Sequence, residues 1–277
     1  MIRRVHLRAP AKVNLRLEVL GKREDGYHWI RTWIYPISLW DEIIVERTEE
    51  GVEISCEPEI VPLEENLCFK AATAFFAQGY GEGGVRVFLR KKIPIGAGLG
   101  GGSSDAAATL KALSLLWSHV GNEGLMALGA KVGADVPFFL IGKGAVMGGM
   151  GEKVLSLLPP LRRWILLVVP SERLSTREVY GKGRWGLTSK GGNNKIFTIP
   201  DQLSSFLRND LEEVAVELYP PLKEIEEILR NEGAEGVSMT GSGTGVFGTF
   251  LRKEEAERAK EGLSSKLEAE IYLVRPL

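Results

Sequence analysis

One segment constrains this chain more than any other: the run Pro94-Ile-Gly-Ala-Gly-Leu-Gly-Gly-Gly-Ser-Ser-Asp-Ala-Ala-Ala. Five glycines fall between positions 96 and 102, after a stretch with strand periodicity and before one with helix periodicity. Without side chains, their backbone N–H groups are able to converge on a phosphate, and the helix that follows presents its positive end to it. A flexible turn is the simpler interpretation, but so many clustered glycines would cost a purely structural loop much conformational entropy. We therefore predict a phosphate-binding loop.

The predicted loop extends to two serines, which are placed to cap the helix or to touch phosphate and metal. Its members are Pro94, Ile95, Gly96, Ala97, Gly98, Leu99, Gly100, Gly101, Gly102, Ser103 and Ser104. A P-loop would need lysine after its second glycine, and this chain has none there. The spacing of glycines also satisfies the dinucleotide fingerprint G-x-G-x-x-G, but the preceding strand has one polar face and Pro94 interrupts the approach. That lone match is weak, although a nicotinamide enzyme stays an alternative.

The composition is that of a folded chain with a sizeable core. A length of 277 residues favours two domains, and 44% hydrophobic with 26% charged residues excludes a wholly disordered chain. The 35 basic and 36 acidic residues nearly cancel, which argues against a global field that draws the chain onto nucleic acid or an anionic membrane. Any anion is therefore held by a local site.

Cysteine and histidine are sparse. Cys56 and Cys68 are too few for a disulfide framework, and with His6, His28 and His119 they lack the spacing of a zinc site. The N-terminus is interrupted by charge and has no apolar core of the kind a signal peptide requires. We expect a reducing cytoplasm and no structural metal site.

The periodicities predict an α+β fold with antiparallel or mixed sheets. Strands are expected at 5–19, 42–46, 52–56, 85–90, 164–169, 245–250 and 271–274, and helices at 66–78, 103–117, 203–218, 222–232 and 254–267. The pattern restarts near residue 155, so we expect one domain over 1–155 and a second over 156–277. The stretch 181–195 lacks periodicity and reads as a functional loop or an insertion.

Two further motifs supply charges suited to phosphoryl transfer. Lys12 stands in Pro10-Ala-Lys-Val-Asn-Leu, and Asp135 stands in Gly133-Ala-Asp-Val-Pro-Phe-Phe. Transfer of phosphate to an alcohol needs a carboxylate to orient the hydroxyl and take its proton, with cations to offset developing charge. Taken singly, Asp135 is more often a helix N-cap and Lys12 a solvated side chain. Their coincidence with a phosphate loop favours the catalytic interpretation.

A fourth cluster of small residues, Met239-Thr-Gly-Ser-Gly-Thr-Gly, precedes a strand. It is either a tight turn or, by analogy with the first loop, part of a nucleotide site. The motifs around Lys12, Gly98, Asp135 and this cluster resemble, in this order, those of the GHMP kinases. Within that superfamily, Asp25-Gly-Tyr-His28, the run 94–107 and Gly133-Ala-Asp-Val-Pro-Phe-Phe together resemble the diphosphocytidyl-methylerythritol kinases. The resemblance covers nearly the whole chain.

This resemblance implies a two-domain fold with the active site in the cleft between the domains. It implies ATP in the N-terminal domain, gripped by 94–104 with Asn66 near the adenine, and Mg²⁺ held mainly by phosphates and water. The 2-hydroxyl of a cytidine diphosphate substrate would attack the γ-phosphate, with Asp135 as base and Lys12 beside it. Neither nucleic acid nor a membrane is implied as partner, and both a monomer and a homodimer stay open.

For the cytidine end, the resemblance assigns Tyr27 and His28 to pyrimidine recognition, Tyr180 to a facing aromatic wall and Asn14 to a substrate contact. The alternative is that Tyr27 belongs to the core, because aromatic-rich stretches usually do. Another GHMP kinase, the related decarboxylase and a non-catalytic regulator on the same fold are the competing functions.

Overall fold

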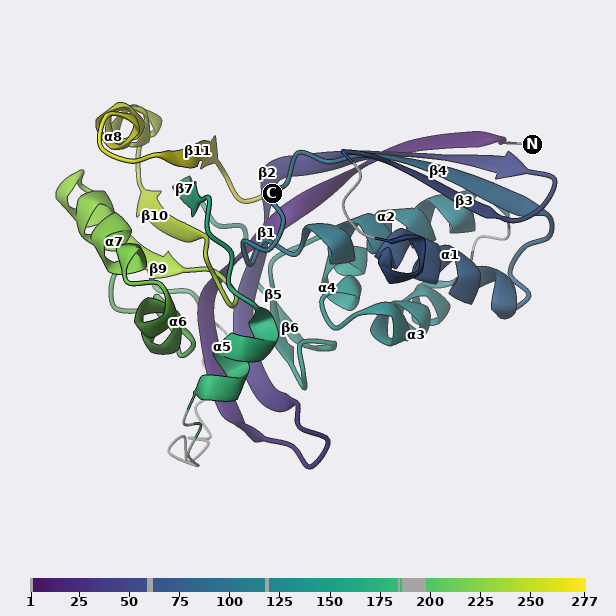
Figure 1. Ribbon diagram of the computed structural model, residues 1–277, viewed down its shortest axis with the longest axis horizontal. Helices are drawn as coiled ribbons and strands as arrows, with labels where there is room; N and C mark the ends of the chain where they lie inside the picture. The colour runs from purple at the N-terminus through teal and green to yellow at the C-terminus, as the bar shows by residue number, and fades with distance from the viewer. Residues whose placement is uncertain (1, 59–61, 118–119, 184, 186–197) are drawn as a thin grey trace. The chain divides into compact units, whose positions relative to one another are not determined.

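The computed structural model describes residues 2–58, 62–117, 120–183, 185 and 198–277. It forms two compact units that alternate along the chain (Figure 1). Unit 1 comprises Met1–Ala11, Leu39–Ile93 and Gly100–Gly142, and unit 2 comprises Lys12–Ser38, Pro94–Leu99 and Lys143–Leu277. The sequence analysis divided the chain by its order into domains 1–155 and 156–277, and that division stays a prediction.

Strands and helices both contribute substantially, and the α+β class is confirmed. The strands are β1 (Arg4–Lys22), β2 (His28–Thr48), β3 (Val52–Glu57), β4 (Gly84–Arg90), β5 (Ala145–Gly148), β6 (Lys153–Leu157), β7 (Trp164–Pro170), β8 (Arg208–Asn209), β9 (Gly236–Met239), β10 (Val246–Phe250) and β11 (Ala269–Val274). The helices are η1 (Leu63–Glu65), α1 (Leu67–Ala77), α2 (Gly101–Leu116), α3 (Asn122–Val132), α4 (Val136–Ile141), α5 (Thr176–Lys182), α6 (Glu212–Leu218), α7 (Pro221–Asn231) and α8 (Lys253–Ser264). None of these helices is long and apolar enough to cross a bilayer.

Unit 1 is a layer of helices on a mixed sheet. Strand β4 pairs in parallel with β3 and antiparallel with the end of β2, in the register Glu42 opposite Arg90. Alternation along β4 buries Val85, Val87 and Leu89 and exposes the residues between them, which explains the polar face seen in the sequence. Helices α1 to α4 pack on one another, and α1 also packs on β3 (Figure 1).

Unit 2 is built on an antiparallel sheet in the order β11-β7-β10-β9. The central strand β7 is buried along 165–169. Helices α7 and α8 pack on this sheet. The first part of β2 pairs with β5, which continues to β6, and β1 pairs in parallel with β8 through Arg16 and Arg208.

The predicted helix over 203–218 is wrong in its first half. The helix begins at Glu212, and the chain before it forms β8. Side chains compete with the helix there, because Asn209 Oδ1 accepts from the Leu211 N–H at 3.0 Å and Asp210 Oδ2 accepts from the Val19 N–H at 2.9 Å. The elements that were not predicted are η1, α3, α4, α5, β5, β6, β8 and β9, and β2 begins at His28 rather than at the predicted residue 42. Most of the aperiodic stretch 181–195 lies outside the described residues.

Candidate active site

The predicted phosphate loop ends at the N-terminus of α2. Gly100 is the N-cap, with a left-handed backbone at φ 69°, and no described side chain caps the helix. Ser103 and Ser104 lie inside the first turn of α2, so the expectation that one of them caps it is wrong. Ser104 is buried, and its Oγ has no hydrogen-bond partner among the described residues. The helix therefore presents uncapped N–H groups at its positive end, which suits an anion.

The first half of the loop, 94–99, is fastened to other parts of unit 2. A Cβ at Gly98 would overlap the carbonyl oxygen of Thr240, so the two loops pack backbone against backbone. Gly245 N donates to Ala97 O at 3.2 Å, and Lys12 N donates to Leu99 O at 3.0 Å. These contacts fix the loop without any ligand.

Arg173 is a further residue on this loop that the sequence analysis did not identify. Its Nε donates to Ile95 O at 2.6 Å, and a Cβ at Gly96 would lie 3.2 Å from its Cδ. Arg173 also donates to the carbonyl oxygens of Pro170 and Glu172. No sequence signal pointed to it, because a single arginine between a strand and a helix is ordinary.

In unit 1, a buried group of three charges holds both flanks of the loop; we call Lys91, Asp41 and Asp105 the Lys91 triad. Lys91 Nζ donates to Asp41 Oδ2 and, at 2.7 Å, to Asp105 Oδ2. Asp41 Oδ1 accepts from the backbone N–H groups of Lys92 and Ile93 at 2.5 and 2.8 Å. The triad thus ties the segment that enters the loop to the first turn of α2.

The carboxyl group of Asp105 has a pKa well above that of an ordinary aspartate. Burial raises its pKa, the nearby Asp41 carboxylate adds to the effect, and Lys91 opposes it, with the result at about 8. Its Oδ1 has no hydrogen-bond partner among the described residues. Burial, with the Asp105 charge beside it, also raises the pKa of the Cys68 thiol in α1. Cys68 is therefore a protonated core residue.

Lys12 and Asn14 lie in a buried polar network of unit 2. Lys12 is 4% exposed and Asn14 is 3% exposed, so the solvated-lysine interpretation is wrong. Lys12 Nζ donates to Asn14 Oδ1, and Asn14 Nδ2 donates to Thr32 Oγ1 at 2.7 Å. Thr240 Oγ1 donates to Asn14 Oδ1 at 3.2 Å. The network was not predicted, since Thr32 and Thr240 carry no motif that links them to Lys12.

Asp135 stands at the N-cap position of α4, as the structural alternative to a catalytic role predicted. Its side chain nevertheless makes no capping hydrogen bond. The residue is half-buried, and its backbone oxygen accepts from Phe139 N at 3.4 Å. Lys111 Nζ donates to Phe139 O at 2.8 Å near the other end of α4, which holds this short helix in place. A positioned carboxylate that does not cap its helix suits contact with a ligand.

Asn66 has a structural role in the same unit. It is the N-cap of α1, and its Oδ1 accepts from the Cys68 N–H at 2.8 Å. The capping bond accounts for an asparagine at this position, and the adenine contact stays a prediction.

Of the residues expected at the cytidine end, Tyr27 and His28 lie in and directly after the turn between β1 and β2 of unit 2. Asp25 forms this turn by accepting from Tyr27 N at 3.1 Å and from the Arg23 guanidinium, which lowers the pKa of its carboxyl. Tyr27 is 64% exposed, so the core interpretation of this ring is wrong. An exposed ring held on an ordered turn suits contact with a ligand.

His28 follows in β2 and is buried. Its ring stacks on Tyr180 of α5, with centroids 5.1 Å apart and planes 28° apart. Trp185 approaches the edge of His28 at 6.1 Å and donates from its Nε1 to Tyr180 O at 2.7 Å, a contact the sequence analysis missed. A base that stacks on Tyr180 must therefore lie on the face of the tyrosine ring opposite His28, or displace the His28 ring.

The His28 imidazole is suited to reading a neutral base edge. Burial, with the charge of Lys22 second, lowers its pKa, so the ring is neutral at pH 7. Its Nε2 has no hydrogen-bond partner within the described part of the chain. A neutral imidazole offers one donor and one acceptor.

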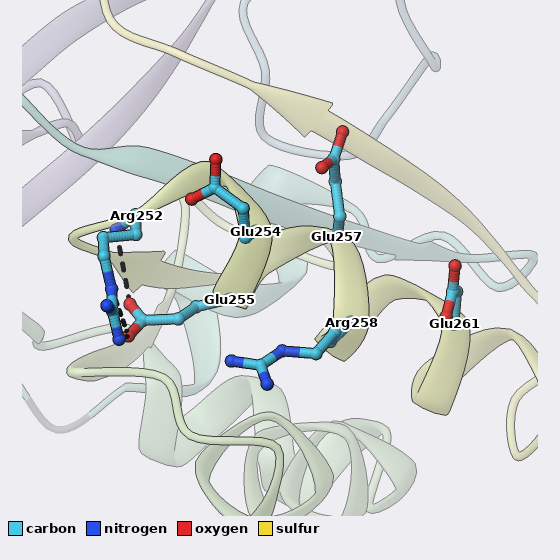
Figure 2. Close-up of a pocket in the computed structure, with 6 residues that line it drawn as sticks. All are labelled: Arg252, Glu254, Glu255, Glu257, Arg258 and Glu261. Atoms are coloured by element: carbon cyan, nitrogen blue, oxygen red, sulfur yellow. Dashed lines mark hydrogen bonds and ion pairs between the residues drawn. The ribbon is translucent and has the colours of Figure 1, made fainter.

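A surface hollow lies elsewhere, along α8 (Figure 2). Its lining residues are Arg252, Glu254, Glu255, Glu257, Arg258 and Glu261. Figure 2 shows Arg252 paired with Glu255, and none of the motif residues lines this hollow. Exposed ion pairs on one helix are typical of a solvated face. The described residues also contain no cluster of three or more His, Cys, Asp or Glu side chains that could hold a metal.

Comparisons with known proteins agree with the motifs. Residues 66–143 match the GHMP kinases N terminal domain, and residues 198–269 match the GHMP kinases C terminal domain. A 4-diphosphocytidyl-2-C-methyl-D-erythritol kinase of Syntrophus aciditrophicus is 40% identical over 97% of this chain and 98% of its own. One from Geobacter metallireducens is 42% identical over 98% of each chain. This chain belongs to the 4-diphosphocytidyl-2-C-methyl-D-erythritol kinase family.

Members of this GHMP family are ATP-dependent small-molecule kinases, and the predicted enzyme class is confirmed. Solved structures agree. A crystal structure of 4-(cytidine 5'-diphospho)-2C-methyl-D-erythritol kinase matches with a TM-score of 0.81 and 39% identity, covering 99% of this chain and 100% of that chain. Homoserine kinase from Cytophaga hutchinsonii has a TM-score of 0.77 at 18% identity, which shows the shared fold alone.

Proposed function

We propose that this enzyme transfers the γ-phosphate of ATP to the 2-hydroxyl of 4-diphosphocytidyl-2-C-methyl-D-erythritol, in isoprenoid precursor synthesis. The observation that supports phosphoryl transfer is the uncapped, glycine-lined N-terminus of α2, because its free N–H groups suit the phosphates of ATP. The substrate is carried over from relatives of that name at 40% and 42% identity.

The roles of the side chains follow from the chemistry of phosphoryl transfer. Asp135 is proposed to accept the proton of the attacking hydroxyl, and its carboxylate is not engaged in capping α4. Lys12 is proposed to lie beside the reacting groups and to offset developing charge. Because the transition state is loose, positioning contributes more than basicity. The buried hydrogen bond from Lys12 to Asn14 supports such positioning.

At the cytidine end, Tyr27 and Tyr180 are proposed to stack on the pyrimidine and His28 to bind its edge. The buried, neutral His28 ring with an unpartnered Nε2 among the described residues supports this role. Asn14 is proposed as a substrate contact in addition to its bond with Lys12. Each of these residues belongs to unit 2.

ATP is used as its Mg²⁺ complex in most kinases, and the ion offsets charge on the phosphates. Asp135 is half-buried and the Ser104 hydroxyl has no partner among the described residues, so both suit an ion carried by ATP. No cluster of three or more acidic, His or Cys side chains in the described chain forms a metal site of its own. We propose that phosphates and water provide most of the Mg²⁺ ligands.

A coupled assay of ADP release tests this proposal. ADP should form only when 4-diphosphocytidyl-2-C-methyl-D-erythritol is present, with mevalonate and homoserine as control acceptors. Phosphorus NMR of the product should show a phosphomonoester in addition to the diphosphate. Phosphorylation of mevalonate or homoserine in place of the cytidine compound would refute the proposed substrate. Product formation without ATP would refute the proposed reaction.

A further inference from the structure

The C-terminal glycine loop, Met239–Gly245, has no role in the mechanism proposed above. It is nevertheless placed against the proposed catalytic lysine within unit 2. A Cβ at Gly241 would lie 3.1 Å from Lys12 Nζ and 2.9 Å from Gly98 O. The loop therefore touches both Lys12 and the first half of the phosphate loop.

The C-terminal glycine loop is held rigidly in this position. Inside it, Thr240 N donates to Gly245 O at 2.8 Å and Gly243 N donates to Thr240 O at 3.1 Å. From outside, Asn209 Nδ2 donates to Met239 O at 2.9 Å and to Gly241 O at 2.8 Å. Asn209 is buried, so these bonds are shielded from water. Thr240 is thus fixed before any ligand binds.

The hydrogen bonds around Asn14 allow only one orientation of its amide. Arg16 O is an acceptor, so the Thr32 hydroxyl donates to it, at 2.8 Å. Thr32 Oγ1 then accepts from Asn14 Nδ2 at 2.7 Å, which turns Asn14 Oδ1 toward Lys12 and Thr240. Oδ1 accepts from the ammonium of Lys12 and from the hydroxyl of Thr240 at 3.2 Å.

Thr240 holds Asn14 at two points. Its Oγ1 accepts from the Asn14 backbone N–H at 3.0 Å while its hydroxyl hydrogen points to Asn14 Oδ1. Thr240 itself is fully buried, and Thr32 is 2% exposed. Water is therefore poorly placed to substitute for the hydroxyl, and its removal leaves a buried N–H group without its acceptor.

We infer that Thr240 is a positioning residue for phosphoryl transfer: its hydroxyl fixes the Asn14 amide, whose oxygen orients the Lys12 ammonium. This inference rests on the proposed role of Lys12. Small displacements of a positioned group cost large factors in rate, because the ammonium must meet charge that develops in one place. Thr240 would then affect turnover more than the binding of either substrate.

A purely structural role makes a different prediction. If Thr240 only fastens the glycine loop to β1 through the Asn14 N–H, its loss should act equally with or without the Asn14 side chain. If it acts through the amide, its loss should matter only while that amide is present. A double-mutant cycle separates the two.

The experiment compares Thr240→Val, Thr240→Ser and Asn14→Ala, singly and combined, in the full-length enzyme. Thr240→Val should lower kcat by about 10- to 100-fold with KM for ATP changed less than about threefold. Thr240→Ser, which keeps the hydroxyl, should remain within about threefold of the wild type. In the Asn14→Ala background, adding Thr240→Val should change kcat by less than about threefold. Thr249→Val, at a buried threonine of β10 outside the network, is the matched control.

Wild-type kcat in Thr240→Val overturns the inference, and so does an equal loss in both backgrounds. If Thr240→Val does not fold, Thr240→Ala carries the same comparison, because alanine removes the hydroxyl without adding bulk. Lys12→Met separates this inference from the proposed function. Wild-type turnover in Lys12→Met would remove the catalytic role of Lys12, whereas an inactive Lys12→Met beside a normal Thr240→Val would refute the role of Thr240 alone.

Discussion

Each compact unit buries a lysine beside the phosphate loop, and the two lysines have different surroundings. In unit 1, Lys91 lies between the carboxylates of Asp41 and Asp105, and its side chain is 7% exposed. In unit 2, Lys12 is 4% exposed, and its ammonium donates to the neutral amide oxygen of Asn14. The first arrangement pairs the ammonium with an opposite charge, and the second includes a hydrogen bond to a neutral amide.

We propose that this difference separates a lysine that stabilises the fold from a lysine that takes part in the reaction. Burying an ammonium costs several kcal/mol unless partners compensate it, and Lys91 has hydrogen bonds to the carboxyl groups of Asp41 and Asp105. The Lys91 triad thereby fixes the flanks of the phosphate loop. The Asn14 amide accepts a hydrogen bond from the Lys12 ammonium and helps to orient it, and a positioned cation suits phosphoryl transfer. We expect changes at Lys91 to appear in stability and changes at Lys12 to appear in turnover.

The largest effect is expected at Asp135, which we propose as the proton acceptor of the reaction. Asp135→Asn keeps the shape but loses the proton acceptor, so kcat should fall by about 10²- to 10⁴-fold. Steady-state kinetics and ATP titration should show little change in ATP affinity. Near-normal turnover would remove Asp135 from the mechanism and leave its N-cap position as its explanation.

Breaking the Lys91 triad should cost the fold rather than the chemistry. Lys91→Met leaves the buried Asp41 carboxylate and the buried Asp105 carboxyl group without their cation, and the free energy of unfolding should fall by about 3–5 kcal/mol. Urea unfolding gives the value. Lys92→Met is the matched control, because the neighbouring Lys92 is 48% exposed and pairs with Glu42 at the surface, where the expected loss is about 0–1 kcal/mol. Equal losses in both variants would contradict the comparison.

At the cytidine end of unit 2, Tyr180→Ala should act on one substrate only. Stacking on a base contributes about 1–3 kcal/mol, so KM for the cytidine substrate should rise roughly 5- to 150-fold while KM for ATP stays constant. Tyr180 also packs against the core of unit 2, as Tyr219 does, so Tyr219→Ala measures the structural part. A parallel rise in both KM values, with a matching loss of thermal stability, would identify Tyr180 as a core residue instead.

A pH-dependent effect is expected at Asp105, and it sharpens the account of the Lys91 triad. Its pKa is raised to about 8 when folded, so the folded state holds a proton that the unfolded state releases near the ordinary pKa of aspartate. Stability should therefore fall as pH rises through this window, with a slope of up to about 1.4 kcal/mol per pH unit. Asp105→Asn removes the slope and should be nearly neutral at low pH. Urea unfolding from about pH 5 to about pH 8 measures the slope, and identical slopes in the wild type and Asp105→Asn would refute the raised pKa of Asp105.

The sequence predicted features that depend on neighbouring residues, and it did not predict contacts between residues that are distant along the chain. Local signals were sufficient for the glycine loop, because strand, glycines and helix follow one another, and for α1, α2, β4 and β7. The Lys91 triad joins residues 14 and 50 positions apart through side chains that have no motif, so only the fold brings them together. Thr240 and Asn14 are 226 positions apart.

The aromatic cluster shows a similar limit. The sequence resemblance named Tyr27, His28 and Tyr180, whereas the stack of His28 on Tyr180 and the edge contact of Trp185 depend on how α5 lies against β2. The failed part of the helix over 203–218 has a local cause, because Asn209 and Asp210 bind backbone groups that helix formation would otherwise use. The spacing of apolar residues gives no sign of such side-chain hydrogen bonds.

The most direct test of the comparison measures kcat and the free energy of unfolding side by side for Lys12→Met and Lys91→Met. Lys12→Met should lose turnover by about 10²-fold or more, while its unfolding free energy changes by only about 0.5–1.5 kcal/mol. Lys91→Met should show the reverse, with near-normal kcat at temperatures where it remains folded. Loss of stability without loss of turnover in Lys12→Met would contradict the assignment of the two buried lysines.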